Sequence, residues 1–151
     1  MKPTAEILEL ENTLQNGGMH EALRWLNSRT PHRFTGIYRY DGDILRNLHL
    51  FDRFDPTVRS GGDTPLIATW CALVGQLDSS LEVPDGAKEV RFPLLPVTQV
   101  ISYCGALIRD ENGDSYGTLC HFDMRPCEER KSDLPLLEAA TPLFYQRIRA
   151  L

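Results

Sequence analysis

The chain has 151 residues, of which 42% are hydrophobic and 25% are charged, the balance of an ordinary globular domain. Its formal net charge of −5 argues against nucleic acid as a partner, because contacts with phosphates need a basic surface. The sequence has no signal-peptide pattern and no apolar run of membrane-spanning length. We therefore expect one domain, covering 1–151, in the cytoplasm and without a membrane partner, with its four cysteines as free thiols.

Residues 1–30 are predicted to form two helices. Apolar residues recur at helical spacing in the first helix, and Gly17-Gly18 is expected to end it, because glycine is common at helix ends. The second helix is predicted at Met19–Ser28, just before a Thr-Pro pair that disfavours helical geometry.

Residues 32–51 have the pattern of a β-hairpin. Apolar residues alternate on both sides of Asp41-Gly42, a pair typical of tight turns. Because side chains alternate along a strand, the second strand is expected to place four residues on one face: Leu45, Asn47, His49 and Phe51.

Residues 52–100 read as a long crossover, broken by prolines and opened by a stretch rich in Gly, Asp and Arg. It contains an apolar helix predicted from about Pro65 to Gln76, which carries Trp70 and Cys71. Aromatic walls with few polar groups are typical of small-ligand sites. The helix and its loops are expected to cover one sheet face and to form a pocket there.

Residues 101–123 contain the strongest hairpin signal, since Asn112-Gly113 accepts the backbone angles of a tight turn. A two-residue turn at this point places Cys104 opposite His121. A thiol beside an imidazole can become a reactive thiolate. The alternative is that Cys104 is a small buried hydrophobe and His121 a hydrogen-bonded residue.

A last helix is predicted at 132–151. Pro135 suits its first turn, whereas Pro142 lies in its interior and is expected to kink or split it. No His, Cys, Asp and Glu set shows the close spacing of a structural zinc site, so no metal is expected.

The stretch Ser102–Asp123 resembles the C-terminal sheet half of a GAF domain, a small-molecule sensor module of signalling proteins. Thr35–Asp43 resembles the first hairpin of that family, and Trp70-Cys71 stands where its members often have an aromatic-Cys pair in a helix. The resemblance implies an α+β fold with a central antiparallel sheet of five or six strands. The terminal helices would cover one face, and the crossover helix and loops the other. The match is carried by Ser102, Tyr103, Gly105, Gly113, Gly117, Thr118, Leu119 and Asp123.

Three classes of function are compatible with this resemblance, which identifies neither a ligand nor a cofactor. We favour a non-catalytic sensor that binds an unidentified small molecule and signals through its terminal helices, as a homodimer or to a downstream protein in trans. The second class is a thiol enzyme, since one GAF branch is similar to free methionine sulfoxide reductases. That branch places reactive cysteines in the crossover, whereas 72–100 contains none here. The third class is a dimerisation module without a ligand.

The predicted pocket lies between one face of the sheet and the crossover helix. One side of the sheet, the crossover helix and the final hairpin are expected to converge on one small-molecule site. Its predicted residues are His49, Phe51, Trp70, Cys71, Cys104 and His121.

Overall fold

The computed structural model describes residues 4–128 and 132–150. A six-stranded sheet with strand order β3-β2-β1-β6-β5-β4 lies at the centre, and every pairing in it is antiparallel. This confirms the predicted α+β class and the predicted number of strands. The elements are α1 (Thr4–Asn27), β1 (Phe34–Asp41), β2 (Ile44–Asp52), β3 (Thr64–Pro65), α2 (Trp70–Leu77), β4 (Leu81–Val83), β5 (Ser102–Arg109), β6 (Ser115–Asp123) and α3 (Leu134–Arg149), with short 3-10 helices at Leu66–Ala68 and Gly86–Lys88.

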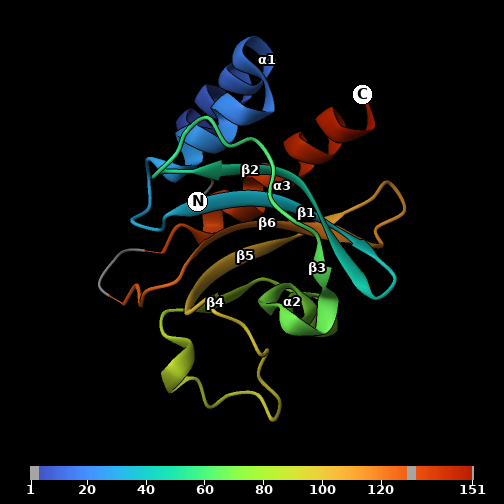
Figure 1. Cartoon of the computed structure of the whole chain (residues 1–151). Coiled ribbons are helices and arrows are strands. Elements are labelled where there is room, and N and C mark those ends of the chain that lie inside the picture. Colours follow the sequence, from blue (N-terminus) through green and yellow to red (C-terminus); the bar gives the residue numbers. More distant parts are fainter. Residues whose placement is uncertain (1–3, 129–131, 151) are drawn as a thin grey trace.

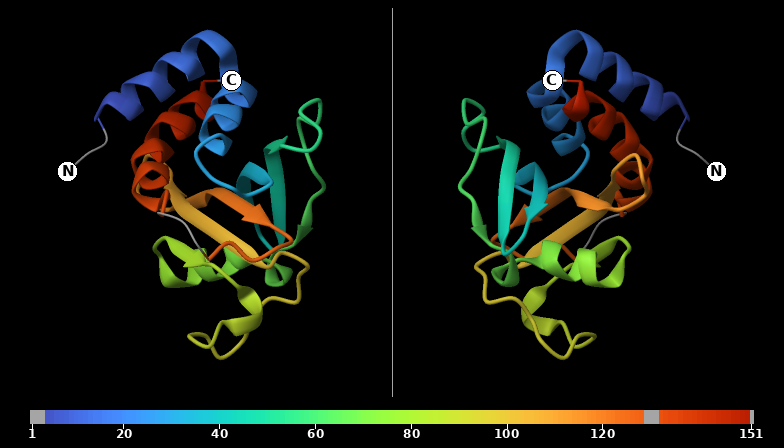
Figure 2. Two further views of the ribbon diagram at one scale, coloured as in Figure 1. Left: turned by 90° about the vertical axis from the view of Figure 1, so that its left-hand side faces the viewer. Right: turned by 90° about the vertical axis from the view of Figure 1, so that its right-hand side faces the viewer.

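The domain has three layers, seen from two sides in Figure 2. Helices α1 and α3 cover one face of the sheet, and α2 with the later part of the crossover covers the opposite face, whereas the segment between β2 and β3 runs along the edge of the sheet and reaches α1 (Figures 1 and 2). The expected division between terminal helices and crossover is therefore confirmed. Within the described residues, no helix combines the length and the apolar composition needed to cross a bilayer.

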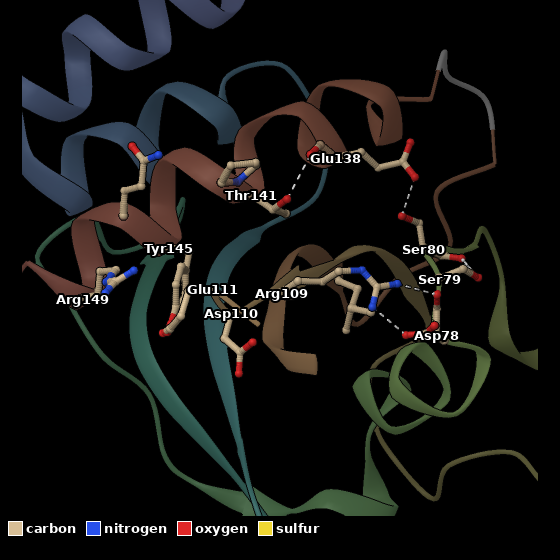
Figure 3. Close-up of a pocket in the computed structure, with 13 residues that line it drawn as sticks. Asp78, Ser79, Ser80, Arg109, Asp110, Glu111, Glu138, Thr141, Tyr145 and Arg149 are labelled. Carbon is tan, nitrogen blue, oxygen red and sulfur yellow. Dashed lines mark hydrogen bonds and ion pairs between the residues drawn. The ribbon is translucent and has the colours of Figure 1, made fainter. Parts of the chain in front are cut away.

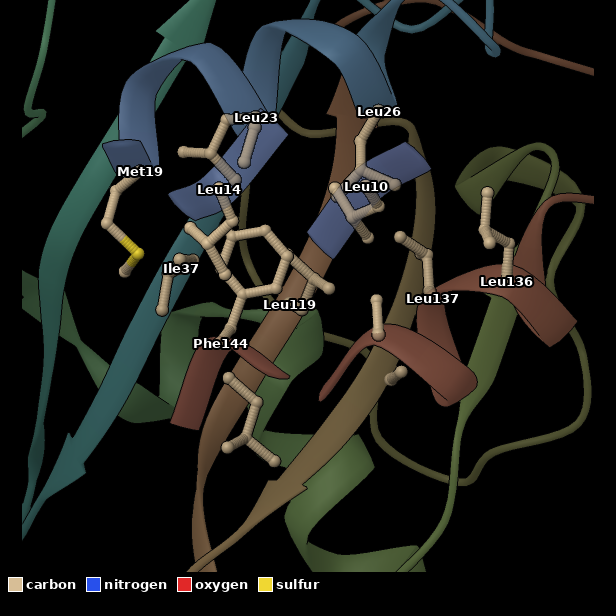
Figure 4. Packing of buried hydrophobic residues seen from close by; sticks show 14 of the residues in the cluster. Leu10, Leu14, Met19, Leu23, Leu26, Ile37, Leu119, Leu136, Leu137 and Phe144 are labelled. Carbon is tan, nitrogen blue, oxygen red and sulfur yellow. The ribbon is translucent and has the colours of Figure 1, made fainter. Parts of the chain in front are cut away.

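The larger hydrophobic cluster fills the space between the sheet and the two terminal helices (Figure 4). Phe144 of α3 is fully buried at its centre. Around it lie side chains from α1, α3 and the inner strands, and burial of their apolar surface is the main stabilising contribution to this layer. The surrounding residues include Leu10, Leu14, Leu23, Leu26, Ile37, Leu119 and Leu137.

Helix α1 is interrupted where the two glycines predicted it. Gly18 has φ 86° and ψ −175° and separates two helical halves. Glycine adopts this positive φ without the steric penalty that a side chain would bring. The break lets both halves place their apolar residues against the sheet.

Of the two outcomes expected at Pro142, a kink or a split of α3, the split does not occur. The helix is continuous from Leu134 to Arg149. Proline has no N–H to donate to the carbonyl four residues earlier, which belongs to Glu138. The Thr141 hydroxyl donates to that same carbonyl oxygen at 3.0 Å. The missing backbone donor is thus replaced by the neighbouring side chain.

We expect Thr141→Val to lower the free energy of unfolding by about 1 kcal/mol, because the Glu138 carbonyl then loses its donor. Urea denaturation measures this loss. Thr13→Val is the matched control: the Thr13 hydroxyl also bonds a carbonyl, that of Glu9, at 2.9 Å. There the helix backbone already supplies an N–H, so the control should lose little. Equal losses in the two variants would contradict the replacement of the proline donor by Thr141.

The predicted grouping of side chains along β2 is wrong at its centre. Leu45 packs with the α2 layer, whereas Phe51 packs with α1 and α3. Leu48 is the extra residue of a β-bulge that follows the pair Ile37–His49. One inserted residue reverses which face the side chains occupy. Strict alternation therefore holds on each side of the bulge but not across it.

The turn between β5 and β6 contains two departures from the prediction that cancel. The Asp110 N–H donates to the Asp114 carbonyl, so three residues rather than two form the loop. A bulge at Tyr116 then shifts the register back by one residue. Cys104 consequently lies opposite His121, as predicted.

Candidate functional site

An apolar pocket of about 200 Å³ lies between the sheet and the crossover layer. It collects side chains from β1, β2, β3, α2, β5 and β6, from the short segment directly before α2, and from the end of the crossover before β5. The residues that line it are Tyr38, Leu45, Thr64, Ala68, Thr69, Trp70, Cys71, Thr98, Val100, Tyr103, Cys120 and Phe122.

The first turn of α2 forms one wall of this pocket. Thr69 is the N-cap, and its hydroxyl oxygen accepts from the Ala72 N–H at 3.2 Å. This cap fixes the start of the helix and places Trp70 and Cys71 in its first turn. The indole N–H of Trp70 donates to the Val100 carbonyl at 3.0 Å, which ties the helix to the end of the crossover.

Tyr103 of β5 forms the opposite wall, and its position depends on Gly105. The two residues share a face of the strand, and the tyrosine ring lies across the glycine. A β-carbon built on Gly105 would lie 2.3 Å from the Tyr103 hydroxyl oxygen. The absence of a side chain therefore lets that hydroxyl reach the Cys71 sulfur, at 3.1 Å.

The polar groups of the pocket converge on the Cys71 thiol. Its sulfur lies 3.1 Å from the Thr118 hydroxyl as well as from Tyr103, and it also interacts with the Cys120 thiol. Burial disfavours the thiolate of Cys71, but the hydrogen bonds with Cys120, Thr118 and Tyr103 outweigh burial and lower its pKa. Burial, and then the neighbouring Cys71, raise the pKa of Cys120.

The tyrosines around the pocket remain neutral. Burial is the largest cause that raises the pKa of Tyr38, Tyr40 and Tyr103. The Tyr40 hydroxyl donates to the Cys71 carbonyl at 2.6 Å. The pocket thus contains neutral hydroxyl donors, two thiols and aromatic rings.

This arrangement of layers and pocket matches solved structures across almost the whole chain. The GAF domain of an Acinetobacter phosphoenolpyruvate-protein phosphotransferase has a TM-score of 0.72 at 12% identity, over 97% of this chain and 92% of that one. The fold is that of a GAF domain.

Two enzymes have similar structures. The free methionine-R-sulfoxide reductase of Neisseria meningitidis, solved with its substrate, has a TM-score of 0.71 at 12% identity, over 95% of this chain and 86% of that one. The Staphylococcus aureus enzyme in its reduced form has a TM-score of 0.63 at 15% identity, over 96% of this chain and 94% of that one. At such identities the similarity shows the GAF fold alone. No family model and no curated protein matches the chain.

The GAF-like domain does not bring the six predicted pocket residues together. Trp70 and Cys71 line the pocket. The other four share one sheet face, as expected, but it is the face covered by α1 and α3, so the prediction that they meet Trp70 and Cys71 is wrong. These four are His49, Phe51, Cys104 and His121.

His121 and Cys104 are paired across the strands but belong to the interior of the helical layer. His121 is 0% exposed. Its Nδ1 lies 2.7 Å from the Thr35 hydroxyl and its Nε2 lies 2.9 Å from a carboxylate oxygen of Asp133. The Asn27 amide also donates to the Thr35 oxygen, at 3.0 Å. Because a carboxylate oxygen accepts, Nε2 carries a proton and donates it to Asp133.

His49 and Phe51 were predicted on the pocket face because the bulge in β2 has no clear mark in the sequence. The Phe51 ring is buried against α1, with its centroid 5.6 Å from that of the His20 ring. Burial, followed by the nearby charges of His20 and Arg59, lowers the pKa of His49. Both residues face the helical layer of the GAF-like domain and not the pocket.

Three residues that contact the Cys71 thiol, namely Tyr103, Thr118 and Cys120, were not among the predicted site residues. Strand alternation could have found them. Tyr103 directly precedes Cys104, and Cys120 directly precedes His121. Because side chains alternate along a strand, Tyr103 and Cys120 point to the sheet face opposite to the one on which the predicted residues Cys104 and His121 lie. Among the described residues, no group of three or more His, Cys, Asp or Glu side chains could hold a metal ion.

A wider surface groove of about 630 Å³ lies between α3 and the end of β5 (Figure 3). Its polar groups bind one another: Arg109 donates to Asp78 at 2.9 Å, and the Ser80 hydroxyl donates to Glu138 at 2.8 Å (Figure 3). The groove has four carboxylates and two guanidinium groups along its lining. This charge balance disfavours an anionic ligand, and the apolar pocket is the better candidate site.

Proposed function

We propose that this GAF-like domain is a non-catalytic sensor that binds a small, uncharged and largely apolar molecule in the pocket beside α2. The observation that carries the proposal is the lining: none of the twelve described residues around the pocket has a charged side chain. Aromatic rings of Trp70, Tyr103 and Phe122 contribute to it. An engineered apolar cavity of about 150 Å³ binds benzene, so a pocket of this size suits a molecule with a single aromatic ring.

Strand β6 provides a physical connection from this pocket to the helical layer. Cys120 lines the pocket, and the next residue, His121, points to the other face and donates to Asp133 at the start of α3. A ligand that displaces β6 would therefore also displace the N-terminus of α3. We infer that the output passes through α1 and α3, either to a second copy of the chain or to a separate signalling protein.

A reductase of the free methionine sulfoxide type is the second candidate. Two thiols within one pocket, Cys71 and Cys120, support it, as does the likeness in fold to the reductases. The substrate argues against it, because a free amino acid carries an ammonium and a carboxylate group. Burying these charges without partners is costly, and the described lining offers no opposite charge. The lack of cysteine in 72–100, where the reductase branch has its reactive cysteines, also argues against a reductase.

Filling the pocket tests the sensor proposal. Ala68 lies on the pocket wall, so Ala68→Leu should occupy the space that a ligand needs. Thermal-shift and tryptophan-fluorescence titrations with phenol and indole should show binding to the unmodified chain, because a ligand of the native state raises its melting temperature. We expect Ala68→Leu to weaken this binding by about tenfold or more, since about 1.4 kcal/mol is a factor of ten.

The control for this experiment is Ala87→Leu, because Ala87 is exposed and lies outside the pocket lining. It should leave binding unchanged. Benzoate, the charged analogue, should bind more weakly than phenol. Tighter binding of benzoate would refute an uncharged ligand class. Conversion of free methionine sulfoxide to methionine in the presence of a dithiol reductant would establish the second candidate instead.

A further inference from the structure

Two cysteines from different parts of the chain meet in the pocket, and ligand binding as proposed above requires neither thiol. Cys71 comes from the first turn of α2 and Cys120 from the centre of β6, 49 positions further along the chain (120 − 71). Both line the same pocket and are almost completely buried. All four cysteines are thiols in this structure, and only these two line the pocket.

We propose that Cys71 and Cys120 form a dithiol couple that a hydroperoxide oxidises to an intramolecular disulfide. The two thiols line the same pocket and interact with each other, and the Cys71 sulfur lies among hydroxyl groups. This sulfur lies 3.1 Å from both the Tyr103 and the Thr118 hydroxyl oxygens. A pocket of about 200 Å³ admits a molecule as small as hydrogen peroxide.

The surroundings assign different roles to the two thiols. Cys71 lies in the first turn of α2, where backbone N–H groups favour a thiolate. The hydroxyls of Tyr103 and Thr118 can donate to that thiolate, and the pKa of Cys71 is lowered while that of Cys120 is raised. Cys71 is therefore the attacking sulfur and Cys120 the resolving one.

The reaction balances in two steps. In the first, the Cys71 thiolate attacks one peroxide oxygen: an S–O bond forms, the O–O bond breaks, and the leaving oxygen takes up the proton that Cys71 released. In the second, the Cys120 sulfur attacks the sulfur of the sulfenic acid. An S–S bond forms, the S–O bond breaks, and hydroxide leaves as water with the proton of Cys120. Both sulfurs are oxidised. Hydrogen peroxide is reduced to two water molecules, and an organic hydroperoxide is reduced to one alcohol and one water molecule.

Tyr103 is a positioning residue in this scheme. Its ring lies across Gly105, which directs the hydroxyl to the Cys71 sulfur. Tyr103→Phe removes only that hydroxyl. The rate of oxidation should fall by about tenfold or more, and the midpoint of its pH profile should move to higher pH because the thiolate loses a donor. A purely structural role for Tyr103 would not move that midpoint.

The test treats the full chain with hydrogen peroxide, then denatures it and alkylates the remaining thiols for intact-mass and peptide analysis. We expect the unmodified chain to lose the mass of two hydrogen atoms and to yield a bridged peptide containing Cys71 and Cys120. The variant Cys104→Ala/Cys127→Ser should react at the same rate. Cys120→Ser should instead accumulate a sulfenic acid at Cys71, which dimedone traps, and Cys71→Ser should leave Cys120 unoxidised.

The peptide analysis of the unmodified chain decides the proposal even where a variant fails to fold. Oxidation of Cys127 alone, or a folded chain that gives no bridge between Cys71 and Cys120, would overturn it. Near-UV circular dichroism before treatment establishes that the chain is folded. Phenol binding is measured separately on the reduced chain, so that a failed oxidation and a failed sensor proposal are distinguished.

Discussion

Gly117→Ala is expected to lower the free energy of unfolding by about 4 kcal/mol or more, among the largest effects of a single substitution. A β-carbon at Gly117 would lie 1.8 Å from the carbonyl oxygen of Tyr38 and 2.8 Å from the carbonyl carbon of the same residue. Both atoms belong to the backbone of β1, which pairs with β6 at this point. The clash cannot be relieved by a rotamer change, so the two central strands would have to separate. Urea denaturation followed by circular dichroism measures the loss.

Gly62→Ala provides the control for this substitution. Gly62 is exposed, has no atom within 4 Å of the position that a β-carbon would take, and does not need a positive φ. Its replacement should change stability by less than about 0.5 kcal/mol. A Gly117→Ala protein as stable as this control would show that the close approach of β1 and β6 is not required.

The second large effect is expected for His121→Ala, which should cost about 3–5 kcal/mol of unfolding free energy. The substitution removes the donor to the buried Asp133 carboxylate and a hydrogen-bond partner of the Thr35 hydroxyl. A buried polar group that loses its partner carries the full cost of its desolvation. Arg29 still lies 3.3 Å from Asp133 and partly compensates the remaining charge.

His121→Gln separates the two contacts, because a glutamine amide can reach the position of Nε2 but not that of Nδ1. It should retain the donor to Asp133 and lose less stability than the alanine variant. Asp133→Asn in combination with His121→Ala should cost less than the sum of the single changes, since contacting residues are coupled. Additive losses, or a stable His121→Ala protein, would contradict the buried network.

The fold was predictable from the sequence because several local signals agreed with one another. Gly17-Gly18 interrupts α1 where expected, and the turn at Asn112-Gly113, together with the bulge at Tyr116, sets Cys104 against His121. Hairpin turns, strand alternation and amphipathic helices each depend on nearby residues, which a single sequence records. The split considered for α3 at Pro142 does not occur, because the Thr141 hydroxyl donates to the carbonyl that the proline leaves without a backbone donor, and helix propensity does not record such a contact.

The candidate site was less predictable because it depends on which face of the sheet each residue occupies. The bulge at Leu48 moves His49 and Phe51 to the helical layer. Cys104 and His121 were paired correctly but were assigned to the wrong face, since strand pairing does not reveal which layer covers which side. The contact of Cys71 with Tyr103 joins residues 32 positions apart and has no local signal.

The strand order also determines how the chain must assemble. The hairpins β1–β2 and β5–β6 each close over a short turn, whereas the central pair β1–β6 joins them across the entire crossover. Closing so long a loop costs entropy before any contact compensates for it, and such non-local pairing slows folding. We therefore expect the two hairpins to form early and independently, and the step that unites them to limit the rate of folding. The pairing of β1 with β6, in the middle of the sheet, would then be completed last.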